Sequence, residues 1–232
     1  LGDLMLELGF DVFNLANNHC LDMGEAGIFS SLDYWAERPG AVTTGVYRNQ
    51  EDYDQIRTIT AQDVVFSFVG ITELTNGLSL PSGSEAIILL GSEEDKIQER
   101  IKKAKEISDV CVVNIHWGNE YTYTPTERQR ELAAKMSEWG ADIIIGHHPH
   151  VIQPIEYIDR PDGSRTLVAY SLGNFISAQD RGERMIGGML DVDITKDFEQ
   201  DAVSITRCEF VPIITHYDRG FANNRLYPFS EY

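Results

Sequence analysis

The sequence predicts a layered α/β sandwich with a mixed sheet, and two features of the chain carry this prediction. Up to about residue 148, short apolar strands alternate with amphipathic helices, which is typical of α/β folds. After that point strands follow one another through hairpin-like turns such as the DRPDGS segment, which indicates antiparallel pairing. We find no internal repeat or low-complexity linker, so we expect a single domain over residues 1–232.

The spacing of apolar residues places the elements in order along the chain. Leu1, Leu4, Met5 and Leu8 recur at helical spacing, and Gly9 can close that helix. Residues 72–90 are rich in Gly, Ser and Pro and predict no regular element. Further helices are expected at 24–37, 92–108 and 126–139, and strands at 11–16, 40–46, 56–60, 64–71, 110–117, 142–148, 152–158, 166–175, 187–195 and 202–215.

A formal net charge of −18 restricts the partners that the chain can have. Nucleic acid is not expected as a partner, because its recognition needs a basic surface that releases counterions. Docking on anionic lipid is disfavoured for the same reason. An acidic chain can still bind an anion, but only through metal ions or a local exception to its overall field.

Two further features bear on the cellular context of the protein. Cys20, Cys111 and Cys208 lie far apart and are odd in number, so we expect free buried thiols rather than a disulfide framework. No apolar stretch approaches the length needed to span a bilayer. The pattern of the first ten residues is typical of the interior of a helix. We therefore expect native sequence before Leu1.

Polar residues collect where three of the expected strands end. Residues 17–19 follow one strand, 116–118 end another, and 147–150 end a third, so that five of the six histidines occupy equivalent positions. Ligand sites in α/β proteins form at the carboxyl ends of strands, so we expect these groups to converge. Because imidazole and amide oxygen are ligands of Zn²⁺, Fe²⁺ and Mn²⁺, the pattern predicts a metal or catalytic site.

Each residue of this pattern, taken singly, could have a structural role instead of a role in metal binding or catalysis. Taken alone, His19 can be interpreted as a hydrogen-bonded surface residue, and His116, which is followed by a tryptophan, as a core histidine. His216 follows a hairpin strand, and we assign it a structural role. Cys20 is expected to be a packing thiol, because sequence neighbours seldom share the geometry of a nucleophile and its base. Asn174 could bring its amide to the site or could belong to an ordinary β-turn.

Three stretches of the chain, 9–24, 116–156 and 170–175, resemble the bacterial capsule-synthesis family of CapA and the poly-γ-glutamate (PgsA-like) synthesis proteins. That family is related to the calcineurin-like metallophosphoesterases. The resemblance implies a metallophosphoesterase-like α/β/β/α sandwich with mixed sheets, whose N-terminal strands are absent from this chain. It also implies a divalent metal, which could be Mn, Zn, Fe or Mg.

The resemblance assigns roles to individual residues of the three stretches. Asn18, His116 and His148 match the ligands of one metal position, and His150 matches a ligand of the other. His19 matches the residue that contacts the leaving group or transition state. The remaining motif residues are expected to contact substrate or to support the ligands: Asp22, His147, Glu120 and Asn174.

Two departures from the family pattern limit what this chain can bind. The Gly-Asp motif of the first strand and the acidic ligand of the second are both absent, which removes half of a two-metal site. Cys20 also stands where an acid normally supports the catalytic histidine. We therefore expect at most one bound ion in this chain. The missing strand would also expose a sheet edge, which could be covered by self-association.

Two functions are compatible with these observations. The first is a metal-dependent hydrolase or transferase that acts on an anionic surface polymer or its precursor, with His19 as proton donor. The alternative is a non-catalytic component of a polymer assembly or export complex, with capsule synthase or export subunits as partners. The charge of −18 favours the alternative, because it repels a polyanion at long range. The resemblance implies an extracytoplasmic, membrane-anchored full-length protein.

Overall fold

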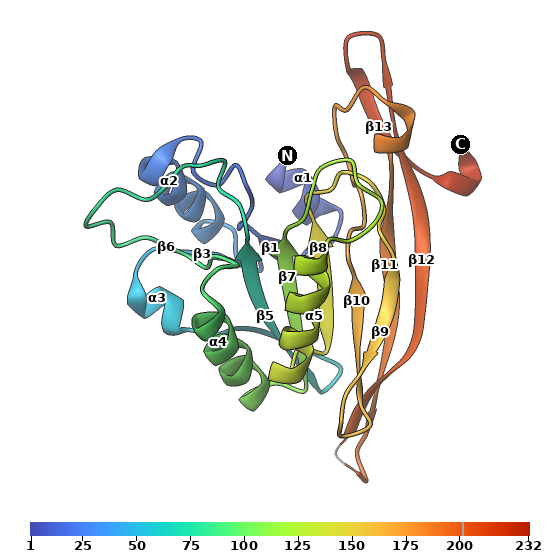
Figure 1. The fold of residues 1–232 in the computed structure, drawn as a ribbon. Helices are drawn as coiled ribbons and strands as arrows, with labels where there is room; N and C mark the ends of the chain where they lie inside the picture. Colours follow the sequence, from blue (N-terminus) through green and yellow to red (C-terminus); the bar gives the residue numbers. More distant parts are fainter. Residues whose placement is uncertain (201) are drawn as a thin grey trace. The chain divides into compact units, whose positions relative to one another are not determined.

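The computed structural model describes residues 1–200 and 202–232, which form two compact units (Figure 1). The first unit comprises Leu1–Trp117 and Met136–Ile143, and the second comprises Gly118–Lys135 and Ile144–Tyr232. Helices and several separate sheets make up a mixed α/β structure, as the sequence predicts. None of the helices among these described residues is long and apolar enough to cross a membrane.

The helices of the first unit follow the predicted periodicity. In α2 (Gly24–Ala36), Ile28 and Leu32 lie one turn apart and are both buried, because residues four positions apart share a helix face. They pack in an apolar cluster with Leu21, Val46, Ala86 and Ile88. The other helices of this unit are α1 (Gly2–Glu7), α3 (Gln50–Asp54) and α4 (Glu94–Glu106), the last of which buries Ile97, Ile101 and Ala104.

The strands of the first unit form three small groups. A parallel pair joins β1 (Val12–Asn14) to β2 (Val42–Thr44), and an antiparallel pair joins β3 (Val46–Tyr47) to β6 (Ile87–Ile88). Within the predicted irregular segment 72–90, the regular residues are Thr72, which ends β5, and the two residues of β6. The third group runs in the order β4 (Arg57–Ala61), β5 (Val64–Thr72) and β7 (Val110–His116).

Strands β5 and β7 place His116, the first of the predicted site residues described here, at a strand end. The two strands are parallel, and their register pairs Thr72 with His116. The apolar side chains of β7 are all buried, as expected for a strand that is covered on both faces, whereas Val65, Phe66 and Phe68 of β5 are partly buried. The pairing holds His116, the last residue of β7, at the carboxyl end of the strands, where the sequence predicts a site.

The second unit begins with a loop and with helix α5 (Glu127–Trp139), whose last residues belong to the first unit. A reciprocal capping box starts this helix: the Gln129 backbone N–H donates to Thr126 Oγ1 (3.2 Å), and the Thr126 backbone N–H donates to Gln129 Oε1 (2.9 Å). These two bonds satisfy backbone donors that a helix start leaves unpaired. Pro125 directly precedes this box, as expected for a helix start.

The other strands, apart from β8 (Ile143–His147), form two antiparallel groups in the second unit. β10 (Arg165–Ala169) lies between β8 and β9 (Ile155–Asp159), and β9 and β10 form a hairpin. A separate three-stranded sheet runs in the order β11 (Ile186–Asp197), β12 (Ala202–Asp218) and β13 (Ala222–Pro228). The short helices η1 (Gly182–Arg184) and η2 (Phe229–Glu231) flank this sheet in sequence.

The prediction of one strand over 166–175 is wrong beyond Ala169, where β10 ends. Gly173 has a φ of +70°, a left-handed conformation outside the extended region that a regular strand occupies. Past Ala169, the segment makes only isolated bridges, between Ile152 and Leu172 and between Gly173 and Gly187. The chain therefore leaves the sheet before Asn174.

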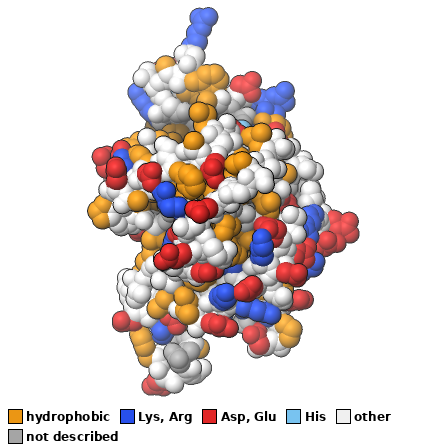
Figure 2. Space-filling view, turned by 90° about the vertical axis from the view of Figure 1, so that its left-hand side faces the viewer, with side chains coloured by type: hydrophobic (Ala, Val, Ile, Leu, Met, Phe, Trp, Pro, Cys, Tyr) orange, Lys and Arg blue, Asp and Glu red, His pale blue; other side chains and the backbone are white. Residues whose placement is uncertain are grey.

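Charged side chains are mixed on the face that Figure 2 shows. Acidic and basic side chains alternate there, with apolar side chains between them. The three cysteines are free, as predicted, but only Cys111 is buried, whereas Cys20 and Cys208 are partly buried.

Candidate functional site

The turn after β1 carries Asn18, which is 7% exposed. Asn18 Oδ1 lies 2.9 Å from His116 Nε2, and Asn18 Nδ2 donates to Asn76 Oδ1 (3.2 Å). The structure thus brings together two of the predicted ligands, which come from the ends of β1 and β7. The third residue, Asn76, was missed by sequence analysis, because it lies in the irregular segment and only its Asn-Gly turn signal marks it.

His19 is exposed and is oriented by an acid from the same turn. Its Nδ1 lies 2.7 Å from Asp22 Oδ2, and because a carboxylate can only accept, Nδ1 carries the hydrogen. Nε2 is then the ring atom that remains for solvent or substrate. Asp22, three positions along the chain, thus offers the His19 ring the kind of carboxylate that the family resemblance implies at the position of Cys20.

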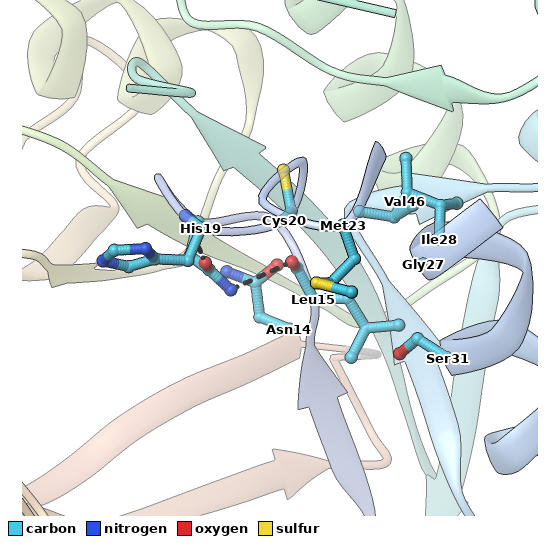
Figure 3. A pocket seen from close by; sticks show the side chains of 10 residues that line it. Asn14, Leu15, His19, Cys20, Met23, Gly27, Ile28, Ser31 and Val46 are labelled. Carbon is cyan, nitrogen blue, oxygen red and sulfur yellow. Dashed lines mark hydrogen bonds between the residues drawn. The ribbon is translucent and has the colours of Figure 1, made fainter. Parts of the chain in front are cut away.

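A cavity of about 320 Å³ lies beside His19 in the first unit (Figure 3). The His19 ring lies at its rim and points away from the apolar side chains that line it, such as Leu15 and Ile28. Burial raises the pKa of the Cys20 thiol, so this group stays protonated at neutral pH and is a poor nucleophile. This agrees with its interpretation as a packing thiol. The lining residues are Asn14, Leu15, Asn17, His19, Cys20, Met23, Gly27, Ile28, Ser31 and Val46.

The second unit holds a compact cluster of Glu120, His148 and His150, whose potential ligand atoms all lie within 4.8 Å of one another. His150 Nε2 lies 3.7 Å from Glu120 Oε1. The Tyr121 N–H donates to the Pro149 carbonyl (2.7 Å), which ties the loop after β7 to the loop after β8. This backbone bond explains how Glu120 reaches the two histidines.

The backbone of the histidine loop is strained. His148 has a φ of +100° and His150 a φ of +59°, a region that residues other than glycine seldom adopt. His148 is also only 9% exposed. Such strain costs free energy and persists where the surrounding structure enforces it, commonly at functional sites. The loop geometry therefore favours a functional role for the two histidines.

The His150 ring is held on several sides. Its Nδ1 lies 2.9 Å from Asn174 Oδ1, and the Tyr121 ring stacks on it with 5.8 Å between ring centroids. The guanidinium carbon of Arg184 lies 3.3 Å above the centroid of the Tyr121 ring, at cation–π distance. Sequence analysis did not find Tyr121 or Arg184, since nothing in the local pattern links them to His150.

The remaining predicted residues lie outside this cluster. His147 is the last residue of β8, and burial lowers the pKa of its imidazole to about 4, so that it is neutral at physiological pH. His216 Nδ1 lies 2.9 Å from the Tyr232 hydroxyl, which fits its expected structural role. Asn18 and His116 belong to the first unit and His148 to the second, so the predicted grouping of these three on one metal stays a prediction.

Both groups of side chains fit a divalent metal by their chemistry. One carboxylate with two imidazoles is a ligand set that Zn²⁺, Mn²⁺ and Fe²⁺ accept. The 2.9 Å between Asn18 Oδ1 and His116 Nε2 is close to the roughly 3 Å expected between two ligands of one ion. The cluster of the second unit is the stronger donor set, because it has three donors and one of them is charged.

Comparison with known proteins decides the family. The family model described as bacterial capsule synthesis protein PGA_cap matches residues 1–179. The chain belongs to the PGA_cap family. The PGA biosynthesis protein CapA of Bacillus subtilis (strain 168) is 31% identical over 214 residues, which are 90% of this PGA_cap chain and 55% of the relative. The capsule biosynthesis protein CapA of Bacillus anthracis is 35% identical over 177 residues, 75% of this chain and 41% of the relative. The chain thus spans about half the length of these curated relatives.

Solved structures confirm the predicted fold of this PGA_cap chain. A putative 5′-nucleotidase from Staphylococcus aureus, in complex with alpha-ketoglutarate, matches with a TM-score of 0.59 and 21% identity over 90% of this chain and 39% of that chain. The 5′-nucleotidase precursor from Thermus thermophilus matches with a TM-score of 0.58 and 14% identity over 91% and 40%. At these identities the likeness concerns the fold alone, which this chain shares with the two 5′-nucleotidase structures.

Proposed function

We propose that this PGA_cap chain is the core of a metal-dependent hydrolase or transferase that acts on an anionic surface polymer or its precursor. The observation that carries the proposal is the cluster of Glu120, His148 and His150, with its strained histidine backbone. The names of the curated relatives support a place in capsule or poly-γ-glutamate (PGA) biosynthesis. The metallophosphoesterase-like fold supports hydrolytic or transfer chemistry.

Glu120, His148 and His150 would hold the ion, and Asn18 with His116 offers a second, weaker set of donors. A bound divalent metal would polarise the oxygen of the scissile group and lower the pKa of a coordinated water. We assign Glu120 to the ligands, because its carboxylate shares the cluster with both imidazoles. This goes beyond the supporting role that the family resemblance implies for it.

His19 is the proposed proton donor. Asp22 holds the His19 ring by Nδ1, so that Nε2 is the atom which can give a proton to a leaving group or take one from a nucleophile. Its exposed side chain leaves room for a large substrate. In this proposal Asp22 acts by orienting the ring, in the way that a carboxylate orients the histidine of a hydrolase triad.

The alternative is a non-catalytic component of a polymer assembly or export complex at the cell envelope. The net charge of −18 supports it, because such a chain repels a polyanionic substrate. In that case capsule synthase or export subunits, or a second copy of the chain, would be its partners. The two proposals differ in whether purified protein turns over substrate.

The test uses the full-length protein with added Mn²⁺ or Zn²⁺ and two substrate classes, model phosphoesters and γ-glutamyl peptides. Metal-dependent turnover is expected in one class, with loss of at least about 100-fold in His19→Ala, as for removal of a general acid. His216→Ala is the matched control, because it removes an imidazole that contacts the Tyr232 hydroxyl and has no assigned part in the site. Absence of turnover in both classes, together with co-purification of synthase or export subunits from native membranes, would establish the alternative.

A further inference from the structure

We infer that Asn174 is a positioning residue: its amide fixes neutral His150 as the Nδ1–H tautomer and thereby presents the Nε2 lone pair to Glu120. The inference rests on the proposed metal site and adds to it the group that prepares one ligand. It also resolves the open interpretation of Asn174, which could have been an ordinary turn residue.

The orientation of the Asn174 amide follows from its partners. Its Nδ2 donates to the Arg184 carbonyl (2.8 Å) and to the His150 carbonyl (3.4 Å). Both partners are backbone oxygens, which can only accept, so the amide nitrogen must lie on that side. Oδ1 then necessarily faces His150 Nδ1, at 2.9 Å.

The tautomer of His150 follows from the amide. Asn174 Oδ1 can only accept a hydrogen bond, so His150 Nδ1 must carry the hydrogen. In a neutral imidazole the other nitrogen then has a free lone pair, and metal ligation through Nε2 requires that lone pair. A hydrogen bond from the non-ligating nitrogen is also the usual way in which proteins orient a metal-binding histidine.

The consequence for the cluster is electrostatic. His150 Nε2 and Glu120 Oε1 lie 3.7 Å apart, and in this tautomer both present lone pairs. Two acceptors facing each other repel unless a cation or a proton lies between them. In this tautomer neutral His150 has no hydrogen on Nε2 to donate to Glu120. A divalent cation between the two atoms can bind both lone pairs, and Asn174 thus prepares a cation position.

The backbone around Asn174 holds the amide rigidly. A Cβ on Gly173 would lie 2.8 Å from the Ile186 carbonyl oxygen, and a Cβ on Gly187 would lie 2.1 Å from the Asn174 carbonyl oxygen. Only glycine at both positions permits this close approach of the two segments. The contact anchors Asn174 to the start of β11, so the amide does not depend on a loose loop for its position.

The test is an NMR measurement on full-length protein with ¹⁵N-labelled histidine, free of metal and at a pH of about 8, where imidazole is neutral. His150 signals are assigned with His150→Gln. The expected result is a protonated Nδ1 and an unprotonated Nε2 in the parent protein. In Asn174→Leu the ring should change to a population with protonated Nε2, and Zn²⁺ affinity by calorimetry should fall about 10- to 100-fold.

A further variant separates positioning from folding. Asn224→Leu is the matched control, because the Asn224 amide also donates to a backbone carbonyl in the second unit, that of Ser177 (3.2 Å). It should change neither the tautomer nor the Zn²⁺ affinity.

The outcomes are distinct for the inference and for the proposed function. Protonated Nε2 in the parent protein, or an unchanged tautomer and Zn²⁺ affinity in Asn174→Leu, would overturn the inference. A parent protein with the expected tautomer that binds no Zn²⁺ would support the positioning role and refute the metal site.

Discussion

At the scale of single residues, His148 and His150 have a strained, left-handed backbone, which distinguishes them from the residues that stabilise the fold. The strain at these positions is enforced by their surroundings, whereas the stability of the unit comes from its buried apolar residues. In β8, for example, Ile144 is completely buried. Substitutions at the two kinds of position should therefore affect metal binding and folding separately.

We predict that His148→Ala lowers Zn²⁺ occupancy but changes the free energy of unfolding by only about 1 kcal/mol or less in chelator. The imidazole is a metal donor in the proposed cluster, and its removal leaves the apolar core intact. Thermal unfolding with chelator measures the second effect. Ile144→Ala is the control and should cost about 2–5 kcal/mol, because it empties a core position. An equally large loss in His148→Ala would mean that His148 is structural.

At the scale of elements, one arginine forms ion pairs on the exposed face of the long β11–β12 hairpin. Arg207 pairs with Asp191 (2.7 Å), Asp193 (2.7 Å) and Glu209 (2.8 Å), which lie on the same two strands. The Arg207 guanidinium holds the pKa of the Asp193 carboxyl below its usual range. A pKa that is lower in the folded state means that the pair stabilises the fold above the unfolded-state pKa. That stabilisation is lost as the pH falls through the folded-state pKa.

Arg207→Gln should therefore raise the pKa of Asp193 toward its ordinary value, which an NMR titration of the carboxyl group can follow. The change in thermal stability at neutral pH should be small, because all four side chains are exposed to screening by solvent. Arg225→Gln on β13 removes an arginine from the same sheet and should leave Asp193 unchanged. An unaltered Asp193 titration in Arg207→Gln would contradict this account of the hairpin.

At the scale of the whole molecule, the distribution of metal donors is unequal between the two units. The first unit offers two neutral donors, Asn18 and His116, whereas the second offers a carboxylate and two imidazoles. Neutral donors compete poorly with water for a divalent ion when only two are present. The two acidic motifs that the family resemblance implies for a second metal position do not occur in residues 1–232.

We therefore predict at most one tightly bound Zn²⁺ per chain in a calorimetric titration of the 232-residue protein. Glu120→Gln should weaken that binding by at least about 10-fold, and His116→Ala should weaken it less. The reverse order would place the ion on Asn18, His116 and His148, the grouping that the family resemblance implies. Two tight sites would show that both groups bind metal independently.

Much of the fold and part of the site could be predicted from the sequence. Helices α2 and α4 and strands β5 and β7 lie where apolar periodicity places them, because burial of one face is decided by residues a few positions apart. Strand-end polarity and family resemblance together predicted Asn18, His116, His148 and His150 as site residues. The structure brings Asn18 to His116 and His148 to His150. The strand over 166–175 was predicted too long, since the left-handed turn at Gly173 depends on its contact with the distant Gly187.

Only the tertiary structure decided which side chains support these residues. Asn18 meets His116 from 98 positions away and Asn76 from 58, separations at which no sequence pattern specifies a contact. The same is true of the Asn174 amide on His150, 24 positions away, whose orientation is set by two backbone carbonyls. Local patterns determine which residues form an element and which end of it is polar. The partners that orient a ligand depend on how the chain brings distant loops together.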